Sequence, residues 1–222
     1  MVASPLAGQV GHDPDKSPYR DIPRSNYLVP TLGYFGGSGG TVGVGPHDGM
    51  TYGLQYSILA NRPVTIGFGI LYGDLQRLVQ DPTLPPETRT SGPISNGVLW
   101  TEVAFQFNLT GNKSWHGIAP FIGAAAGLAF AEDPIEDQTG FDMGTRIYIA
   151  PMLGTRYFFA NRLHLQLDAR FQFWQIKYPE SFRQPPRTSL LSPPVLPDGV
   201  LSEWVVTPWV RAGFGWSFSL PF

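Results

Sequence analysis

The sequence predicts an all-β fold, an eight-stranded antiparallel up-and-down transmembrane β-barrel. Apolar and polar residues alternate along about eight segments, each close to the ~10 residues of a tilted strand that crosses a membrane. The links between these segments are alternately short and long. Only 14% of the residues are charged, yet no continuous apolar run reaches the ~20 residues of a membrane-spanning helix. Alternating strands account for both features, because they spread apolar residues over many segments.

The composition narrows the classes of function. With 26 glycines and 22 prolines, extensive helix is unfavourable. The chain has no cysteine, which excludes disulfides, thiolate catalysis and zinc–thiolate sites. The formal net charge of −2 gives no electrostatic basis for nucleic-acid binding. Residues 1–8 lack a charged start followed by an apolar core, so we expect the mature chain of an exported protein, with its signal peptide absent.

The elements follow in chain order. Residues 1–24 are polar and contain several prolines, so we expect an irregular N-terminal extension there and the barrel in residues 25–222. The expected strands are residues 25–36, 50–60, 63–78, 97–109, 117–131, 145–159, 163–178 and 203–220.

The links between the strands fall into two classes. The tripeptide Ala-Asn-Arg occupies both 60–62 and 160–162 and predicts two tight hairpins at the same rim, and the link 110–117 is also short. Short periplasmic turns and long extracellular loops are typical of outer-membrane barrels, and this arrangement places both termini on the periplasmic side. The long links are 36–49, 80–96, 132–144 and 179–202.

The phase of the alternation is clearest in the seventh strand. One face carries Leu163, Leu165, Leu167, Ala169, Phe171 and Phe173, and the other carries His164, Gln166, Asp168, Arg170 and Gln172. A soluble lipocalin-type barrel would show the same alternation with the apolar face inside. Its exterior would then be mostly Gly, Ala, Thr and Gln, which is a poorly charged and sticky surface. The sequence therefore favours the membrane arrangement.

Four prolines fall inside expected strands, namely Pro30, Pro120, Pro151 and Pro208. Proline removes a hydrogen-bond donor from the ladder, so strand interiors normally exclude it. We expect these positions to mark bulges or strand ends.

The last strand resembles the C-terminal β-signal of bacterial outer-membrane barrels. In that order of residues, Arg211 is the polar position, Gly213 the glycine, and Trp216 and Phe218 the two aromatics, with Phe222 offering a second register. Together with the architecture, this makes residues 25–222 similar to the small OmpA-, OmpX- and OmpW-type barrels. The resemblance implies location in the bacterial outer membrane, contact with its lipid and lipopolysaccharide, and recognition by the barrel-assembly machinery.

Five charged residues project inward on the expected strands: Glu102, Arg156, Asp168, Arg170 and Arg211, with Arg146 nearer the loop end. Counted from the hairpin 160–162, Arg156 lies diagonal to Asp168, within side-chain reach. Glu102, Arg170 and Arg211 should lie at similar heights, in a lumen just wide enough for side chains. The cluster resembles the internal salt-bridge plug of the OmpA-type domain. Its expected role is to satisfy buried charges and close the lumen.

No catalytic, metal or cofactor site is predicted. Lipid-modifying barrel enzymes use His and Ser with a carboxylate near the outer rim, and here only His47, beside Asp48, lies near that rim. It sits in a glycine-rich loop without the rigidity of a strand. The acidic run in 132–144 lacks the residue order of a calcium loop and is expected to be solvated; it contains Glu132, Asp133, Glu136, Asp137 and Asp142.

The sequence therefore favours a non-enzymatic barrel with a structural or interaction role, a lumen plugged by side chains and surface-displayed loops. One alternative is a narrow passive channel for a small or apolar solute. The second is a lipid-modifying outer-membrane enzyme. The proline-rich loops 82–93 and 179–197 could also present stiff segments to a protein partner.

Overall fold

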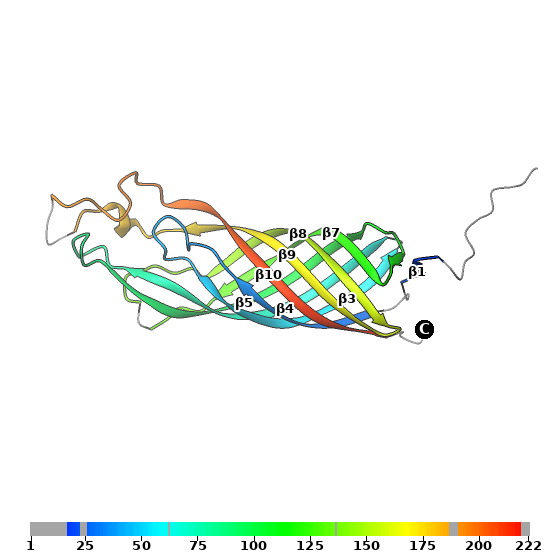
Figure 1. The fold of residues 1–222 in the computed structure, drawn as a ribbon. Helices are drawn as coiled ribbons and strands as arrows, with labels where there is room; N and C mark the ends of the chain where they lie inside the picture. Colours follow the sequence, from blue (N-terminus) through cyan, green and yellow to red (C-terminus); the bar gives the residue numbers. More distant parts are fainter. Residues whose placement is uncertain (1–16, 23–25, 62, 136, 187–190, 219–222) are drawn as a thin grey trace, which may run out of the picture.

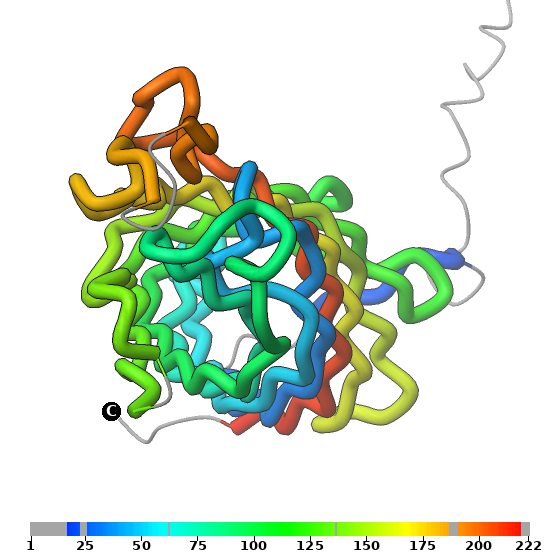
Figure 2. Tube along the Cα trace, turned by 90° about the vertical axis from the view of Figure 1, so that its left-hand side faces the viewer, coloured from blue at the N-terminus to red at the C-terminus, as the bar shows by residue number. Residues whose placement is uncertain are grey.

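The computed structural model describes residues 17–22, 26–61, 63–135, 137–186 and 191–218. Eight long antiparallel strands form a closed ring (Figures 1 and 2), as the sequence predicts. The ring closes where β10 pairs with β2 and where β7 pairs with β8. The strands are β2 (Asn26–Phe35), β3 (His47–Asn61), β4 (Val64–Gln80), β5 (Thr90–Asn108), β7 (Ile118–Ala131), β8 (Thr145–Ala160), β9 (Leu163–Lys177) and β10 (Ser202–Phe218).

Two short strands lie outside the ring. β1 (Tyr19–Asp21) pairs with β6 (Lys113–Trp115), in register at Arg20 and Ser114. The N-terminal segment expected to be irregular therefore contains a strand, which is held because Ile22 is buried beside Tyr27 and Ala119. A four-residue 3-10 helix, η2 (Glu180–Arg183), follows β9. Within the described residues, no helix combines the length and the apolarity needed to cross a membrane.

The two ends of the barrel differ in their connections. We call the end with the tight β3–β4 and β8–β9 hairpins the inner end, and the end with the long links the outer end (Figure 1). Several strands extend further toward the outer end than the sequence predicts. β3 begins at His47 rather than at 50, and β5 begins at Thr90 rather than at 97. These extensions continue the ladders between β3, β4 and β5.

Burial settles which face of the barrel is apolar. On β9, Leu165, Leu167 and Phe171 are about half exposed on the outside, whereas Asp168 and Arg170 are buried inside. The same outward apolar face continues around the barrel in Phe68, Phe105, Ile149 and Val210, among others. The lipocalin-type inversion is therefore excluded, because the polar residues face the lumen.

The prediction that the four prolines mark bulges or strand ends is wrong, because each lies within its strand and no register shift occurs at any of them. The register shifts lie elsewhere, for example between Leu59 and Asn61 and between Phe158 and Ala160. Each proline instead pairs with only one of the two neighbouring strands. Toward the other strand, the regular pairing either skips the proline or has already ended. Pro151 pairs with Ala124 of β7, while the β8–β9 ladder passes from Ile149 to Met152 without it.

The other three prolines follow the same rule. Pro30 pairs with β3, while the β2–β10 ladder passes from Leu28 to Thr31 without it. Pro120 and Pro208 each lie one residue beyond the end of a ladder, next to Phe121 and Trp209 respectively. A residue without an N–H is tolerated where the neighbouring strand offers no regular partner for that donor.

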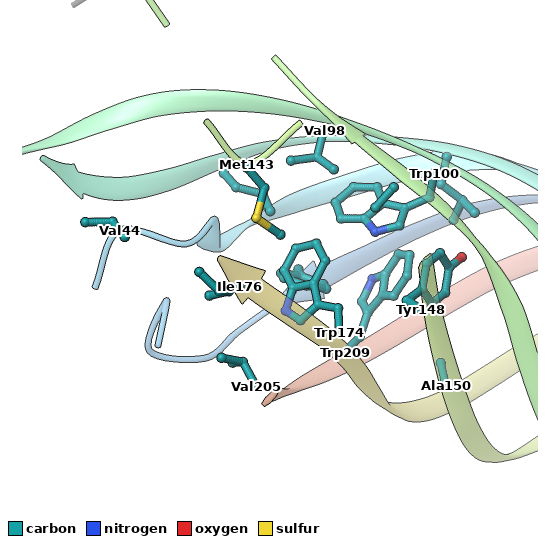
Figure 3. Packing of buried hydrophobic residues seen from close by; sticks show 14 of the residues in the cluster. Val44, Val98, Trp100, Met143, Tyr148, Ala150, Trp174, Ile176, Val205 and Trp209 are labelled. Carbon is teal, nitrogen blue, oxygen red and sulfur yellow. The ribbon is translucent and has the colours of Figure 1, made fainter. Parts of the chain in front are cut away.

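The lumen is filled in layers. Toward the outer end lies an aromatic layer of Phe35, Trp100, Trp174 and Trp209, whose ring centroids approach to 5.1–5.6 Å. Figure 3 shows its three tryptophans close together in the lumen. Beyond it, apolar side chains from three of the long loops enter the same core, and we call them the loop cap. They are Val44, Phe141, Met143, Phe182, Val195 and Leu196.

Glycine is required where the lumen is crowded at the inner end. His164 is fully buried there between Tyr27 and Phe158, with ring centroids 5.2 and 4.9 Å away. A Cβ on Gly215 would lie 2.0 Å from His164 Cε1, so any larger residue at this position of β10 would displace the ring.

Candidate functional site

Four charged side chains from three strands meet at mid-lumen, and we call them the charge network: Glu102, Asp168, Arg170 and Arg211. Arg170 Nη1 lies 2.7 Å from Glu102 Oε2, and Arg170 Nε lies 2.7 Å from Asp168 Oδ1. Arg211 Nε lies 3.1 Å from Asp168 Oδ1, and its Nη1 lies 3.4 Å from Glu102 Oε1. Each arginine thus contacts both carboxylates, and the formal charges cancel.

Strand register and small neighbours place these side chains. Arg211 and Asp168 lie directly opposite each other in the β9–β10 ladder, on the inward face. Glu102 reaches the network from β5 over Gly69 of β4, where a Cβ would lie 2.7 Å from Glu102 Cγ. The glycine-rich inward face of β4 therefore provides the space that the glutamate occupies.

Neutral groups complete the network. Tyr148 donates a hydrogen bond to Glu102 at 3.0 Å, and Arg211 donates to Gln55 at 3.2 Å. The guanidiniums of Arg170 and Arg211 lie 5.6 and 5.3 Å from the ring centroid of Trp209, which belongs to the aromatic layer. All four charged side chains are at most 1% exposed, so their charges are compensated almost entirely by each other.

Arg156 does not join the charge network directly. The expected contact with Asp168 is replaced by hydrogen bonds to the amide oxygens of Gln166, Asn108 and Gln106. Gln166 in turn donates to Asp168 at 3.3 Å, so it bridges the two residues. Gln166 lies directly opposite Arg156 in the β8–β9 ladder and reaches the guanidinium first.

The structure places the other candidate residues outside the network. Arg146 lies at the outer end of β8, where it donates to the backbone carbonyls of Thr145 and Asp142. His47 is not in a loop, as the sequence suggests, but begins β3, and its Nδ1 lies 2.8 Å from the Gly45 carbonyl. This contact engages one ring nitrogen of His47, and among the described residues no hydrogen bond from His47 to a serine or a carboxylate accompanies it.

The acidic loop 132–144 is not simply solvated. Asp137 Oδ2 lies 2.5 Å from Arg77 Nη1 of β4, and both side chains are at most 2% exposed. Thr139 donates to the same carboxylate from its backbone N–H at 2.9 Å and from its hydroxyl. Glu136 lies outside the described residues. Among the residues that the structure describes, no three His, Asp or Glu side chains gather as metal ligands would.

The sequence reasoning missed Arg77 and the tryptophans of the aromatic layer. The signal was present, because Arg77 shares the inward phase of Thr65 and Gly69 on β4, and Trp209 shares that of Arg211. Trp174 likewise points into the lumen, in phase with Arg170.

The terminal-strand residues divide between the two faces of β10. Arg211 is buried in the lumen, and Gly213 lies on the same inward phase. Trp216 and Phe218 lie on the outward phase, with ring centroids 5.3 Å apart. Phe222 lies outside the described residues.

Comparison with known proteins supports the fold. No protein-family model matches the chain, and no curated protein matches it. The crystal structure of Neisserial surface protein A (NspA) is similar with a TM-score of 0.53 and 13% identity, over 87% of this chain and 97% of that one. The chain therefore has the fold of a small bacterial outer-membrane β-barrel. At this identity the likeness concerns the fold alone.

Two further structures resemble the chain less closely. Ail, the attachment invasion locus protein of Yersinia pestis in complex with the heparin analogue sucrose octasulfate, gives a TM-score of 0.38 at 12% identity, over 87% of this chain and 97% of that one. A major outer membrane protein from Thermus thermophilus gives 0.41 at 14% identity, over 87% and 99%. TM-scores this low support no inference.

The Asp137–Arg77 pair predicts a pH-dependent loop. Burial acts to raise the pKa of Asp137, but hydrogen bonds from Thr139 and Arg77 outweigh it, so the pKa lies below its ordinary value. A lowered pKa means that the contact stabilises the loop above the ordinary aspartate pKa of about 4 and is lost as the pH falls through the lowered value. In hydrogen–deuterium exchange, Asp137→Asn should therefore speed exchange in 138–144 at pH 6.

As the pH falls through the lowered pKa, this difference between the variant and the wild type should shrink, because the wild-type carboxyl also becomes protonated. Asp133→Asn, which removes an exposed charge from the same loop, is the matched control and should leave exchange unchanged over the whole pH range. Equal exchange of Asp137→Asn and wild type at pH 6 would contradict the role given to this ion pair.

Proposed function

We propose that this chain is a non-enzymatic protein of the bacterial outer membrane with a structural or interaction role. Its lumen is closed to solutes by side chains, and its long loops are displayed at the cell surface. The charge network carries the proposal, because four mutually paired charged side chains fill the middle of a lumen that is only about as wide as side chains.

The aromatic layer supports a closed lumen independently. It covers the charge network on the outer side, where Trp209 contacts both guanidiniums and donates to Thr51 at 2.9 Å. The loop cap then packs on the aromatic layer. A solute crossing the barrel would have to displace an apolar layer and a paired, charged layer in succession.

The alternatives receive less support. A passive channel for a small or apolar solute needs a continuous path through both layers. A lipid-modifying enzyme needs a base beside a nucleophile near the outer rim, and the described contacts of His47 include a backbone carbonyl at Nδ1 but no serine hydroxyl. The conductance experiment below separates the passive channel from the closed barrel.

Glu102→Gln should loosen the closed lumen. Removing one partner of a buried ion pair typically costs about 3–5 kcal/mol, and rearrangement of Asp168 between the two arginines should recover part of that. In planar bilayers, we expect wild type to be nearly silent and Glu102→Gln to open briefly and more often. Single-channel recording gives the opening frequency of each.

Glu180→Gln is the matched control, because the side chain of Glu180 is 72% exposed and pairs with Arg183 in η2, outside the charge network. It should leave the bilayer as quiet as wild type. A steady wild-type conductance would refute the closed lumen and favour the passive channel.

The proposed orientation can be tested with trypsin on intact cells. Arg183 lies in the long outer link with a side chain that is 50% exposed, so cleavage should occur there. Arg162 is also exposed, but it lies in the hairpin at the inner end and should be spared. Mass spectrometry of the fragments identifies the sites, and permeabilised cells provide the control in which Lys113 and Arg162 become accessible. Cleavage after Arg162 in intact cells would reverse the orientation.

The terminal strand is proposed to act as the assembly signal. Trp216 and Phe218 present adjacent outward rings at the end of β10, so Trp216→Ala or Phe218→Ala should lower the amount of folded barrel in the outer membrane. Heat-modifiable electrophoretic mobility measures the folded fraction, and Phe222→Ala tests the second register. Val210→Ala removes an outward side chain, 59% exposed, from the same strand and serves as the control. Wild-type folding of all three aromatic variants would reject the signal.

A further inference from the structure

One seam of the barrel is open at its outer end. The β8–β9 ladder ends at the pair Tyr148 and Trp174, although both strands continue outward by three more residues. On its other side, β8 stays paired with β7 through Thr145, and β9 stays paired with β10 through Lys177. The two strands therefore separate from each other while each keeps its other neighbour.

A proline lies near this separation. Pro151 lies in the interruption of the same ladder, between the pairs of Ile149 and Met152, and has no N–H to donate. The regular β8–β9 pairing in the outer half of the barrel is thus reduced to two adjacent pairs, those of Tyr148 and Ile149. Beyond these two pairs, toward the outer end, β8 and β9 are no longer hydrogen-bonded to each other.

A groove of about 570 Å³ lies at this seam, within the roughly 300–1,000 Å³ of small-molecule sites. Its apolar walls face outward, with Ile147 75% exposed, Ile149 52% and Trp204 67%. Side chains of this kind on the outside of a barrel contact lipid, and Trp is favoured where lipid meets water.

The same groove carries two positive charges. Arg146 and Lys177 both line it, and no Asp or Glu does so among the described residues. The Arg146 guanidinium donates only to backbone carbonyls, those of Thr145 and Asp142, and neither cation forms an ion pair with a carboxylate in the described part of the chain. The groove therefore offers two positive charges next to an apolar wall, and the nearby Asp142 carboxylate acts on Arg146 through space without forming an ion pair.

We propose that this open seam binds one lipopolysaccharide molecule through its lipid A. A lipid A phosphate lies between Arg146 and Lys177, and an acyl chain lies along Ile147, Ile149 and Phe173. Charge complementarity selects this occupant, because guanidinium and ammonium groups are the side chains that bind phosphate, and an apolar chain suits the remaining wall. The site lies toward the outer end, where the proposed orientation places the lipopolysaccharide leaflet, so the inference rests on the outer-membrane function proposed above.

Native mass spectrometry of the refolded barrel in a neutral detergent tests the site. Wild type should retain one lipid A, and the double variant Arg146→Gln/Lys177→Gln should bind it at least about tenfold more weakly, because both charge-assisted contacts are lost. The matched control is Arg20→Gln/Lys113→Gln, which removes two exposed cations from the inner end and should bind as wild type does. Fully dephosphorylated lipid A should bind wild type as weakly as the double variant binds lipid A.

A steric variant tests the position without changing charge. Ala126 lines the groove on β7, so Ala126→Trp should fill it and weaken binding, whereas Ala212→Trp on the outward face of β10 should not. Equal binding of dephosphorylated lipid A, equal binding of phosphatidylglycerol, or wild-type binding by Ala126→Trp would each overturn the proposal. Heat-modifiable mobility shows in the same samples that the barrel is folded. A folded wild type without lipid A would reject this site alone, whereas cell-surface trypsin cleavage decides the proposed location.

Discussion

An eight-stranded barrel is so narrow that the side chains on its inward face must fill the space and satisfy one another. The charge network is the solution that this chain adopts, with Glu102 and Asp168 each shared between Arg170 and Arg211. Little water reaches the site, so an unpaired member would be costly. The pairing of β9 with β10 places Asp168 opposite Arg211, and the glycines of β4 leave room for Glu102 to reach them.

The charge network and the aromatic layer depend on each other. Trp209 joins the two, because its ring lies against the two guanidiniums of the charge network and against Phe35 and Trp100 of the aromatic layer. An apolar cover lowers the local dielectric and strengthens the ion pairs beneath it. The outer side of the aromatic layer is covered in turn by the loop cap. The interior is therefore one continuous packing from mid-lumen to the outer end.

Much of this could be predicted from the sequence, because a strand with period two leaves a legible pattern. The alternation in 163–173 gave the inward phase that contains Asp168 and Arg170, and the repeated Ala-Asn-Arg marked two hairpins at the inner end. The alternation shows which side chains point inward, but not which of several inward neighbours a side chain will bind. For this reason the sequence predicts a contact of Arg156 with Asp168, whereas the structure has hydrogen bonds to the surrounding amides. Loop contacts such as Arg77 with Asp137 leave no periodic signal, because they join a strand to a segment 60 residues away.

The loops at the outer end are tied to one another and to the strands. Thr41 donates to both carboxylate oxygens of Glu203, and Arg89 donates to the Pro193 carbonyl, so segments remote in sequence share one surface. A molecule approaching this end meets a composite shape assembled from several loops. A synthetic peptide copied from one loop lacks the neighbours that shape it, so antibodies raised against the folded barrel should recognise discontinuous epitopes.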